Sequence, residues 1–480
     1  MAKRIPAEAG KAQLLYEAVM KWFVFCIGIL HIAITMLGYV ATNLTQVLIK
    51  TEKAALVLLI IAALAYVVIT KKKNPQLMYR IKAFLKKLFC PEFLILALVF
   101  AWYLICIVSA DERYTANFYK ANKNYVYRVL TDIIVMFPMF CYFTEKDSQK
   151  MMEYIAHFFA SVLTPAMIYV LWNLFQLNII NLPDGGQIGM DAELRLSISC
   201  HGNMTGANAE IILMLCVCMA IRKKGIIRWL YIFASAVHLA VLILSNSRTT
   251  FIAATFTLVL ITVKLIYTAL EQKPKIKKIL ISAAAGIMVI IIMLCLRTAL
   301  FNAFERTTHL SEILNAQKTS SAVATEASSA APEAAAEDFD NGARTLNLNT
   351  SGRPKIWKAS LKSVFSSVGN AIFGVTPVGV SSEIKKYGGM EVAYTHNQFL
   401  EYAVAIGIPG LLGCCWWLFR IARKVAEITL HNKKTFMILM LLMLVTANMM
   451  EAMLLFYGNL SEVVFFLLAG MVVYSPEQAL

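Results

Sequence analysis

Two arginines in this chain stand where they could bind a phosphate group. Arg248 closes the polar turn 245–248 after an apolar stretch, and Arg353 follows Gly352 at the start of a predicted helix, 353–367. A guanidinium grips phosphate through two parallel hydrogen bonds, and the free N–H groups of a helix N-terminus attract anions. We therefore predict chemistry on a lipid-linked phosphate, with a functional role for Arg248 and a pyrophosphate-binding role for Arg353. The alternatives are a snorkelling anchor for Arg248 and a solvated loop position for Arg353.

His396 is a third candidate for chemistry. It lies just before an apolar segment, and Asn397 and Glu401 follow it closely. Imidazole titrates near neutral pH, so it is suited to accept a proton from a sugar hydroxyl. A structural histidine is the alternative. His201, His309 and His396 lack metal-ligand spacing and no carboxylate cluster accompanies them, so we expect no metal and no cofactor.

The composition is that of a membrane protein. Hydrophobic residues make up 59% of the 480 residues and charged residues only 15%, whereas soluble domains carry about 25% charged residues. Several continuous apolar runs reach the roughly 20 residues that cross a bilayer as a helix, and alternation typical of a membrane β-barrel is missing. The net charge of +16 is spread over short loops on alternate sides of these runs, which argues against nucleic-acid binding.

We predict an all-α polytopic fold of about twelve transmembrane helices. The expected helices are 22–42, 54–70, 91–110, 129–143, 154–177, 207–221, 226–244, 249–268, 279–296, 399–419, 435–456 and 461–474. Clusters of Lys and Arg lie in the loops 71–90, 144–153, 222–225, 269–278 and 420–434. The positive-inside rule then puts these loops and both chain termini in the cytoplasm.

This arrangement leaves one large extracytoplasmic loop. Helices 1–9 occupy residues 1–296, the loop covers 297–398, and helices 10–12 occupy 399–480. Within the loop, 319–336 is rich in Ala, Ser and Glu and is predicted to be flexible. The helix 353–367 is amphipathic and is expected to lie on the membrane surface. The glycine-punctuated turn 372–379 either lets backbone approach a ligand or is a plain loop.

Ionisable residues inside predicted spans are a further expectation, because charges in a bilayer are costly and often functional. Asp132 and Glu210 fall near the outer ends of their predicted helices and could face a substrate cavity. Lys264 is expected to snorkel, and Glu451 receives no definite role.

Together these short motifs resemble the O-antigen ligase and polymerase family. The resemblance covers about residues 205–420 and rests on the order of the motifs along the chain. They are Ser247-Arg248, Ser351-Gly352-Arg353 with Trp357, Ile372-Phe373-Gly374-Val375, and His396-Asn397 with Leu400, Gly407 and Gly410. The low-complexity insert 319–336 is a departure from the family pattern.

The resemblance implies an inverting, metal-independent glycosyl transfer at the extracytoplasmic face of the cytoplasmic membrane. The donor is a glycan on undecaprenyl pyrophosphate, and the acceptor is a glycan, a lipid or a protein. Arg248 and Arg353 are expected to bind the pyrophosphate and stabilise its growing charge, while His396 activates or orients the acceptor hydroxyl. Arg195 is expected to be a third phosphate contact. The remaining expected substrate-binding residues are Ser247, Asn397 and Glu401.

Other classes of protein stay open at this point. A transporter or flippase of lipid-linked glycan also has about twelve helices and basic residues for pyrophosphate. Transporters often show related halves, however, and we see no internal repeat here. A protein O-oligosaccharyltransferase would share the donor and differ only in the acceptor, and a non-catalytic membrane scaffold is a further alternative.

Overall fold

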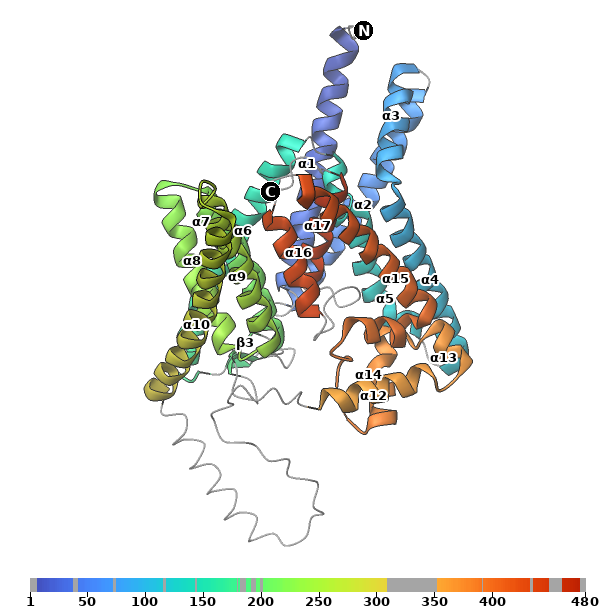
Figure 1. Ribbon diagram of the computed structural model, residues 1–480. Helices are drawn as coiled ribbons and strands as arrows, with labels where there is room; N and C mark the ends of the chain where they lie inside the picture. Colours follow the sequence, from blue (N-terminus) through green and yellow to red (C-terminus); the bar gives the residue numbers. More distant parts are fainter. Residues whose placement is uncertain are drawn as a thin grey trace, which may run out of the picture.

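The fold is seen in a computed structural model, shown in Figure 1. The structure describes residues 7–37, 42–71, 75–114, 118–142, 145–178, 180–181, 187–190, 196–198, 202–308, 352–390, 392–431, 435–448 and 460–474.

Helices dominate the described part of the chain. The first half contains α1 (Ala7–Leu37), α2 (Thr42–Lys71), α3 (Pro75–Leu88), α4 (Pro91–Tyr114), α5 (Phe118–Thr131) and α6 (Glu145–Phe175). The second half contains α7 (Gly202–Arg222), α8 (Gly225–Leu244), α9 (Arg248–Ala269), α10 (Lys275–Thr308), α12 (Arg353–Val364), α13 (Val368–Phe373), α14 (Thr376–Gly388), α15 (Gln398–His431), α16 (Thr435–Asn448) and α17 (Leu460–Tyr474).

The predicted polytopic membrane fold agrees with these helices. Within the described residues, seven helices are long and apolar enough to cross a bilayer, and they lie in α4, α6, α7, α8, α9, α10 and α15. Two shorter apolar helices, Val19–Thr35 and Leu460–Tyr474, accompany them. The total of twelve spans stays a prediction.

Two predicted helices are interrupted. The segment predicted as one helix over 129–143 is α5 followed by a π-helical turn (η1, Asp132–Met136) and a 3-10 turn (η2, Met139–Tyr142). The interruption is caused in part by Pro138, which cannot donate a backbone hydrogen bond. The helix predicted from 399 breaks at Ile406 and Gly407, whose backbone angles are not helical.

A small antiparallel sheet is also present, which the all-α prediction missed. Its strands are β1 (Ile180–Asn181), β2 (Gln187–Met190) and β3 (Leu196–Ile198), paired in the order β1-β2-β3. Ile188 pairs with both Ile180 and Ile198. Strands of two to four residues are too short to show a period-two pattern in the sequence, so the sheet left no detectable signal.

The helices form a bundle with a buried centre. Figure 1 shows α6 to α10 on one side, α3 to α5 with α15 on the other, and α1, α16 and α17 between them. Every residue of α17 is buried, and most of α7 is buried too, as expected for helices that are apolar all round. By contrast, α10 exposes apolar side chains such as Ile276, Leu280 and Ile287, as a lipid-facing helix must.

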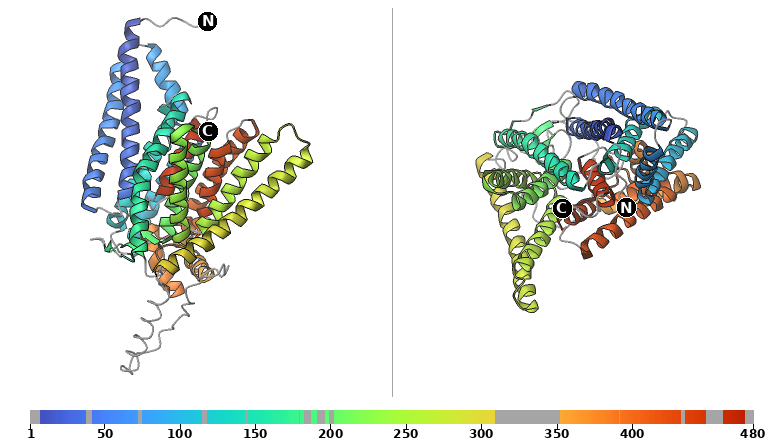
Figure 2. Two further views of the ribbon diagram at one scale, coloured as in Figure 1. Left: turned by 90° about the vertical axis from the view of Figure 1, so that its left-hand side faces the viewer. Right: turned by 90° about the horizontal axis from the view of Figure 1, so that it is seen from above.

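The helices α12, α13 and α14 lie beyond one end of the bundle. The start of α1 and the end of α17 lie toward the opposite end, as Figures 1 and 2 show. The predicted threading, in which both termini lie on one side of the membrane and the large loop on the other, stays a prediction.

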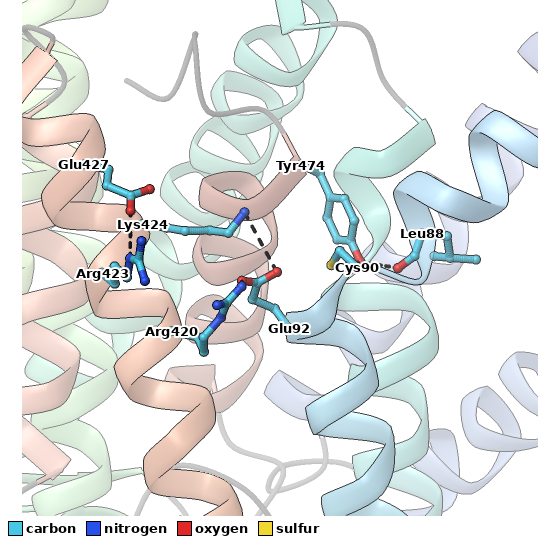
Figure 3. Close-up of polar contacts among 8 residues, drawn as sticks. All are labelled: Leu88, Cys90, Glu92, Arg420, Arg423, Lys424, Glu427 and Tyr474. Atoms are coloured by element: carbon cyan, nitrogen blue, oxygen red, sulfur yellow. Dashed lines mark hydrogen bonds and ion pairs between the residues drawn. The ribbon is translucent and has the colours of Figure 1, made fainter.

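At the end away from α12–α14, ion pairs join α4 to α15 (Figure 3). The buried Glu92 carboxylate accepts hydrogen bonds from Arg420 Nε at 3.0 Å and from Arg420 Nη2 at 2.7 Å. Lys424 lies 3.8 Å from the other oxygen of Glu92. Two hydrogen bonds to one carboxylate fix the orientation of α15, whose other end follows the loop that contains His396.

Candidate functional site

The turn 245–248 has the tight form expected from its sequence. The amide of Ser245 donates to Val241 O at 2.8 Å and ends α8. Asn246 then adopts a left-handed backbone (φ +49°), which asparagine tolerates better than most residues. Ser247 precedes the first residue of α9, and that residue is Arg248. The predicted phosphate-binding arginine therefore begins a helix, where the helix dipole adds positive potential.

Helix α7 packs closely against this turn. A Cβ atom added at Gly206 would lie 2.7 Å from Ser245 Oγ and 2.8 Å from both Ser247 Cβ and Thr250 Oγ1. Only glycine leaves room for so close an approach. The backbone of α7 thus fixes the place of the turn.

Arg353, which lies in the large loop, contacts the start of α9. Gly352 has a left-handed backbone (φ +76°) and starts α12, of which Arg353 is the first residue. Arg353 Nη1 donates to Thr249 Oγ1 at 3.4 Å. Two helix N-termini, each beginning with an arginine, are therefore neighbours. Both dipoles and both guanidinium groups favour an anion at this point.

His396 lies in a short loop ahead of α15 that is held by its own hydrogen bonds. The amide of Thr395 donates to Glu401 Oε2 at 2.9 Å, and Asn397 Oδ1 accepts from the amides of Phe399 and Leu400 at 3.0 and 3.1 Å. His396 has a left-handed backbone (φ +53°), and its ring centroid lies 4.4 Å from that of Tyr394. The histidine is partly exposed while its neighbours are fixed.

Both Asn397 and Glu401 use side-chain oxygens to accept hydrogen bonds from backbone amides around His396. Asn397 caps α15, and Glu401 is fully buried against the loop backbone. The contacts seen make both of them positioning residues for His396. Their predicted contact with substrate stays a prediction, as does that of Ser247.

The glycines of the remaining motifs allow the large loop to dock on α15. A Cβ atom at Gly407 (φ +69°) would lie 2.0 Å from Ile372 O, and one at Gly374 (φ +66°) would lie 2.5 Å from the Ala405 backbone. The amide of Val375 donates to Val404 O at 2.8 Å. Gly374 thus permits a close approach to α15.

The break in α15 leaves a carbonyl that other helices satisfy. Ile406 O accepts from Trp102 Nε1 at 2.9 Å. The Trp102 ring also stacks on Phe373, with ring centroids 5.5 Å apart. Irregular backbone inside a membrane segment needs such partners, because the bilayer offers none.

Comparison with known families adds to this geometry. Residues 233–415 match a family model described as O-antigen ligase. Within this range the chain is similar to the O-antigen ligase family. The matched region runs from α8 into α15 and contains Arg248, Arg353 and His396. This similarity and the long apolar helices indicate an integral membrane protein of the O-antigen ligase type. A search of curated proteins gave no match.

One polar residue of the ligase-family domain was missed from the sequence. Arg297 was predicted to open the large loop, but α10 continues to Thr308. Its Nη2 donates to Asn246 Oδ1 at 3.0 Å, so it contacts the Arg248 turn directly. The apolar residues Leu300, Phe301 and Phe304 continue the helical pattern and were the signal for the longer helix.

Helix α5 adds two polar side chains beside the His396 loop. Burial raises the pKa of the Tyr125 phenol, the charge of Arg128 opposes the shift, and the charge of Glu401 adds to it. The phenol therefore stays protonated and can act as a donor. Asn122, also on α5, accepts from Tyr103 at 3.1 Å and donates to Thr376 Oγ1 at 3.1 Å, which ties α14 to the bundle.

The predicted cavity-facing residues Asp132 and Glu210 are both fully covered by protein. Asp132 Oδ1 lies 3.4 Å from His31 Nε2, and His31 Nδ1 lies 2.8 Å from Glu52 Oε1. Asp132 thus belongs to a buried charge cluster between α1, α2 and η1. The interruption of the helix at η1, which the sequence analysis did not foresee, is what places it there.

Several predicted residues lie outside the described residues. They are Arg195, His201, His309, Glu451 and the insert 319–336. Across the ranges that the structure does describe, no group of three His, Cys, Asp or Glu residues could hold a metal ion.

Proposed function

We propose that this protein transfers a glycan from undecaprenyl pyrophosphate to an acceptor hydroxyl, as a polymerase or a ligase of surface polysaccharide. The contact between Arg353 Nη1 and Thr249 Oγ1 carries the proposal, because it puts two arginine-bearing helix N-termini together. A pyrophosphate has two or more negative charges to be neutralised. Two forked guanidinium groups on neighbouring helix ends are suited to that task.

The arginines act on the leaving group. As the bond between the anomeric carbon and the pyrophosphate oxygen breaks, the electron pair moves to that oxygen. Arg248 and Arg353 stabilise the charge that develops there, in a preorganised electrostatic role. Because a neutralised diphosphate leaves readily, neither a strong general acid nor a metal is required.

His396 acts on the acceptor. The acceptor hydroxyl oxygen attacks the anomeric carbon from the face opposite the leaving group, which inverts the configuration, and its proton passes to the imidazole. The products are a new glycosidic bond and undecaprenyl pyrophosphate. Thr395, Asn397 and Glu401 serve this step by holding the loop that carries His396.

We place this chemistry at the extracytoplasmic face of the cytoplasmic membrane, with about twelve helices and both termini in the cytoplasm. The positive-inside bias of the short loops supports that orientation. The position of α12–α14, away from the start of α1 and the end of α17, agrees with it (Figure 1).

The acceptor decides between the members of this class and is tested by product analysis. Purified protein is given an undecaprenyl-pyrophosphate oligosaccharide from its own host, with and without a candidate acceptor. Longer glycans on the carrier identify a polymerase, and glycan moved to another lipid or to a protein identifies a ligase or a protein O-oligosaccharyltransferase. Movement of intact donor across vesicles with no new glycosidic bond would replace the proposal by a flippase.

A further inference from the structure

Arg297 is the charged residue of this region that the proposed function does not use. It lies about two thirds of the way along α10, and only 9% of its surface is exposed. Charged residues in membrane helices are rare and are functional by default, since burying an unpaired charge is costly. Its burial therefore needs an explanation.

The contacts of Arg297 are polar and aromatic. Besides its bond to Asn246 Oδ1, the guanidinium carbon lies 5.5 Å from the Phe251 ring centroid and 5.6 Å from that of Phe301. Both distances are within the range of cation–π attraction. Among the described residues, no carboxylate forms an ion pair with Arg297. The side chain is thus fixed in place, and its charge is not neutralised by those residues.

The placement of Arg297 also brings like charges together. Its guanidinium interacts electrostatically with that of Arg248. Two cations at close range repel each other, and an anion bound between or beside them removes the repulsion. Such an arrangement is expected of an anion site and would be unfavourable in a purely structural one.

Arg297 further acts on the geometry of the turn. Asn246 has a left-handed backbone, and its side-chain oxygen is held by Arg297. Arg248 follows two positions later at the start of α9. Fixing Asn246 therefore fixes the direction in which the chain enters α9 and presents Arg248.

We propose that Arg297 is a positioning residue of the donor site, which orients the Arg248 turn and adds a third positive charge for the pyrophosphate. This inference rests on the proposed function. It states that the donor site requires three arginines: Arg248 on α9, Arg297 on α10 and Arg353 on α12.

The test separates charge from shape. Arg297→Lys keeps the charge but loses the forked geometry, whereas Arg297→Gln loses the charge. Arg306→Gln removes an exposed charge from the same helix and is the matched control. We expect the KM for the lipid-linked donor to rise about tenfold in Arg297→Gln, less in Arg297→Lys, and not in Arg306→Gln, since a charged hydrogen bond contributes on that scale. The KM for the acceptor should stay unchanged in all three.

A binding readout keeps the test independent of turnover. Undecaprenyl pyrophosphate, added to each purified protein in detergent, should raise the thermal unfolding midpoint of the wild type and of Arg306→Gln, and raise it much less in Arg297→Gln. If the wild type binds this probe but transfers no glycan, the proposed function fails while the role of Arg297 in binding stands.

Two results would overturn the inference. One is an Arg297→Gln protein that unfolds earlier yet binds the probe and the donor as the wild type does, because Arg297 would then serve stability alone. The other is a donor KM that stays at the wild-type value in both Asn246→Ala and Arg297→Lys. Asn246→Ala removes the acceptor of the Arg297 hydrogen bond. If Arg297→Gln does not fold, Asn246→Ala and Arg297→Lys carry the test.

Discussion

Thr249 Oγ1 accepts a hydrogen bond from Arg353 Nη1 at 3.4 Å, although 104 positions separate the two residues in the chain. The bond joins the first turn of α9 to the first turn of α12, across α10 and the first half of the large loop. It brings together the helix starts that carry Arg248 and Arg353, the residues proposed to bind the pyrophosphate. The predictions for the donor site follow from this contact.

Replacing Arg353 should weaken catalysis far more than replacing its charged neighbour. We expect Arg353→Ala to lower kcat/KM for the donor about 10²–10³-fold, the scale on which removal of one preorganised donor acts. Arg353→Lys should recover part of the loss, because lysine keeps the charge without the fork. Lys355→Ala, on the exposed side of the same helix, is the control and should stay within about twofold of the wild type.

His396→Asn should abolish most of the chemistry while leaving donor binding intact. Asparagine tolerates the left-handed backbone found at His396, so this variant removes the imidazole with little strain. We expect the single-turnover rate to fall about 10²–10⁴-fold, the usual contribution of a general base. Binding of undecaprenyl pyrophosphate should be unchanged. A variant that loses both properties would indicate a structural histidine.

Gly407→Ala should prevent the large loop from docking. The new Cβ would collide with Ile372 O, and α15 would lose the break that admits α13. Gly389 shares the positive φ (+68°), with ψ 13° where Gly407 has 179°, and has open space around it, so Gly389→Ala reports the strain of a left-handed residue alone, about 1–2 kcal/mol. Thermal unfolding in detergent should show a clearly larger loss for Gly407→Ala than for Gly389→Ala. Equal losses would mean that the close contact does not matter.

The charge cluster of Figure 3 offers a matched pair for stability. Glu92 is buried and accepts two hydrogen bonds from Arg420, whereas Glu427 and its partner Arg423 are both largely exposed. Glu92→Gln should lower the free energy of unfolding by about 1–3 kcal/mol, because it leaves Arg420 without its charged partner. Glu427→Gln should change it by about 0.5 kcal/mol or less. Similar effects of the two substitutions would contradict the proposal that Glu92 stabilises the fold through Arg420.

Much of the fold was readable because long apolar runs encode membrane helices directly. The seven long apolar helices fall where the sequence predicted helices, as α8 and α9 illustrate. The breaks in the helices at 132–142 and at Ile406–Gly407 could not be predicted from the sequence. Pro138 marks one of them, but the break at Gly407 depends on a contact with Ile372 that is distant in the sequence. Pattern-based prediction sees the helix period and not its tertiary partners.

The candidate site residues could be singled out from the sequence for a related reason. Arg248, Arg353 and His396 stand at helix starts or in a loop beside one, where polar residues in an apolar chain are conspicuous. The structure joins the Arg353 side chain to the Arg248 turn. Arg297 was missed because the apolar run before it ends at 296, which concealed the last turns of α10. The sequence could not show that oxygens of Asn397 and Glu401 accept hydrogen bonds from backbone amides, and their predicted contact with substrate stays a prediction.

The most direct test of the central claim is the release of undecaprenyl pyrophosphate during glycan transfer. Purified wild type, Arg248→Ala, Arg353→Ala and His396→Asn are incubated with the lipid-linked oligosaccharide in EDTA, and both products are measured over time. We predict one undecaprenyl pyrophosphate per new glycosidic bond in the wild type, no inhibition by EDTA, and loss of both products in the three variants. Undiminished release and transfer in Arg248→Ala and Arg353→Ala would contradict the account.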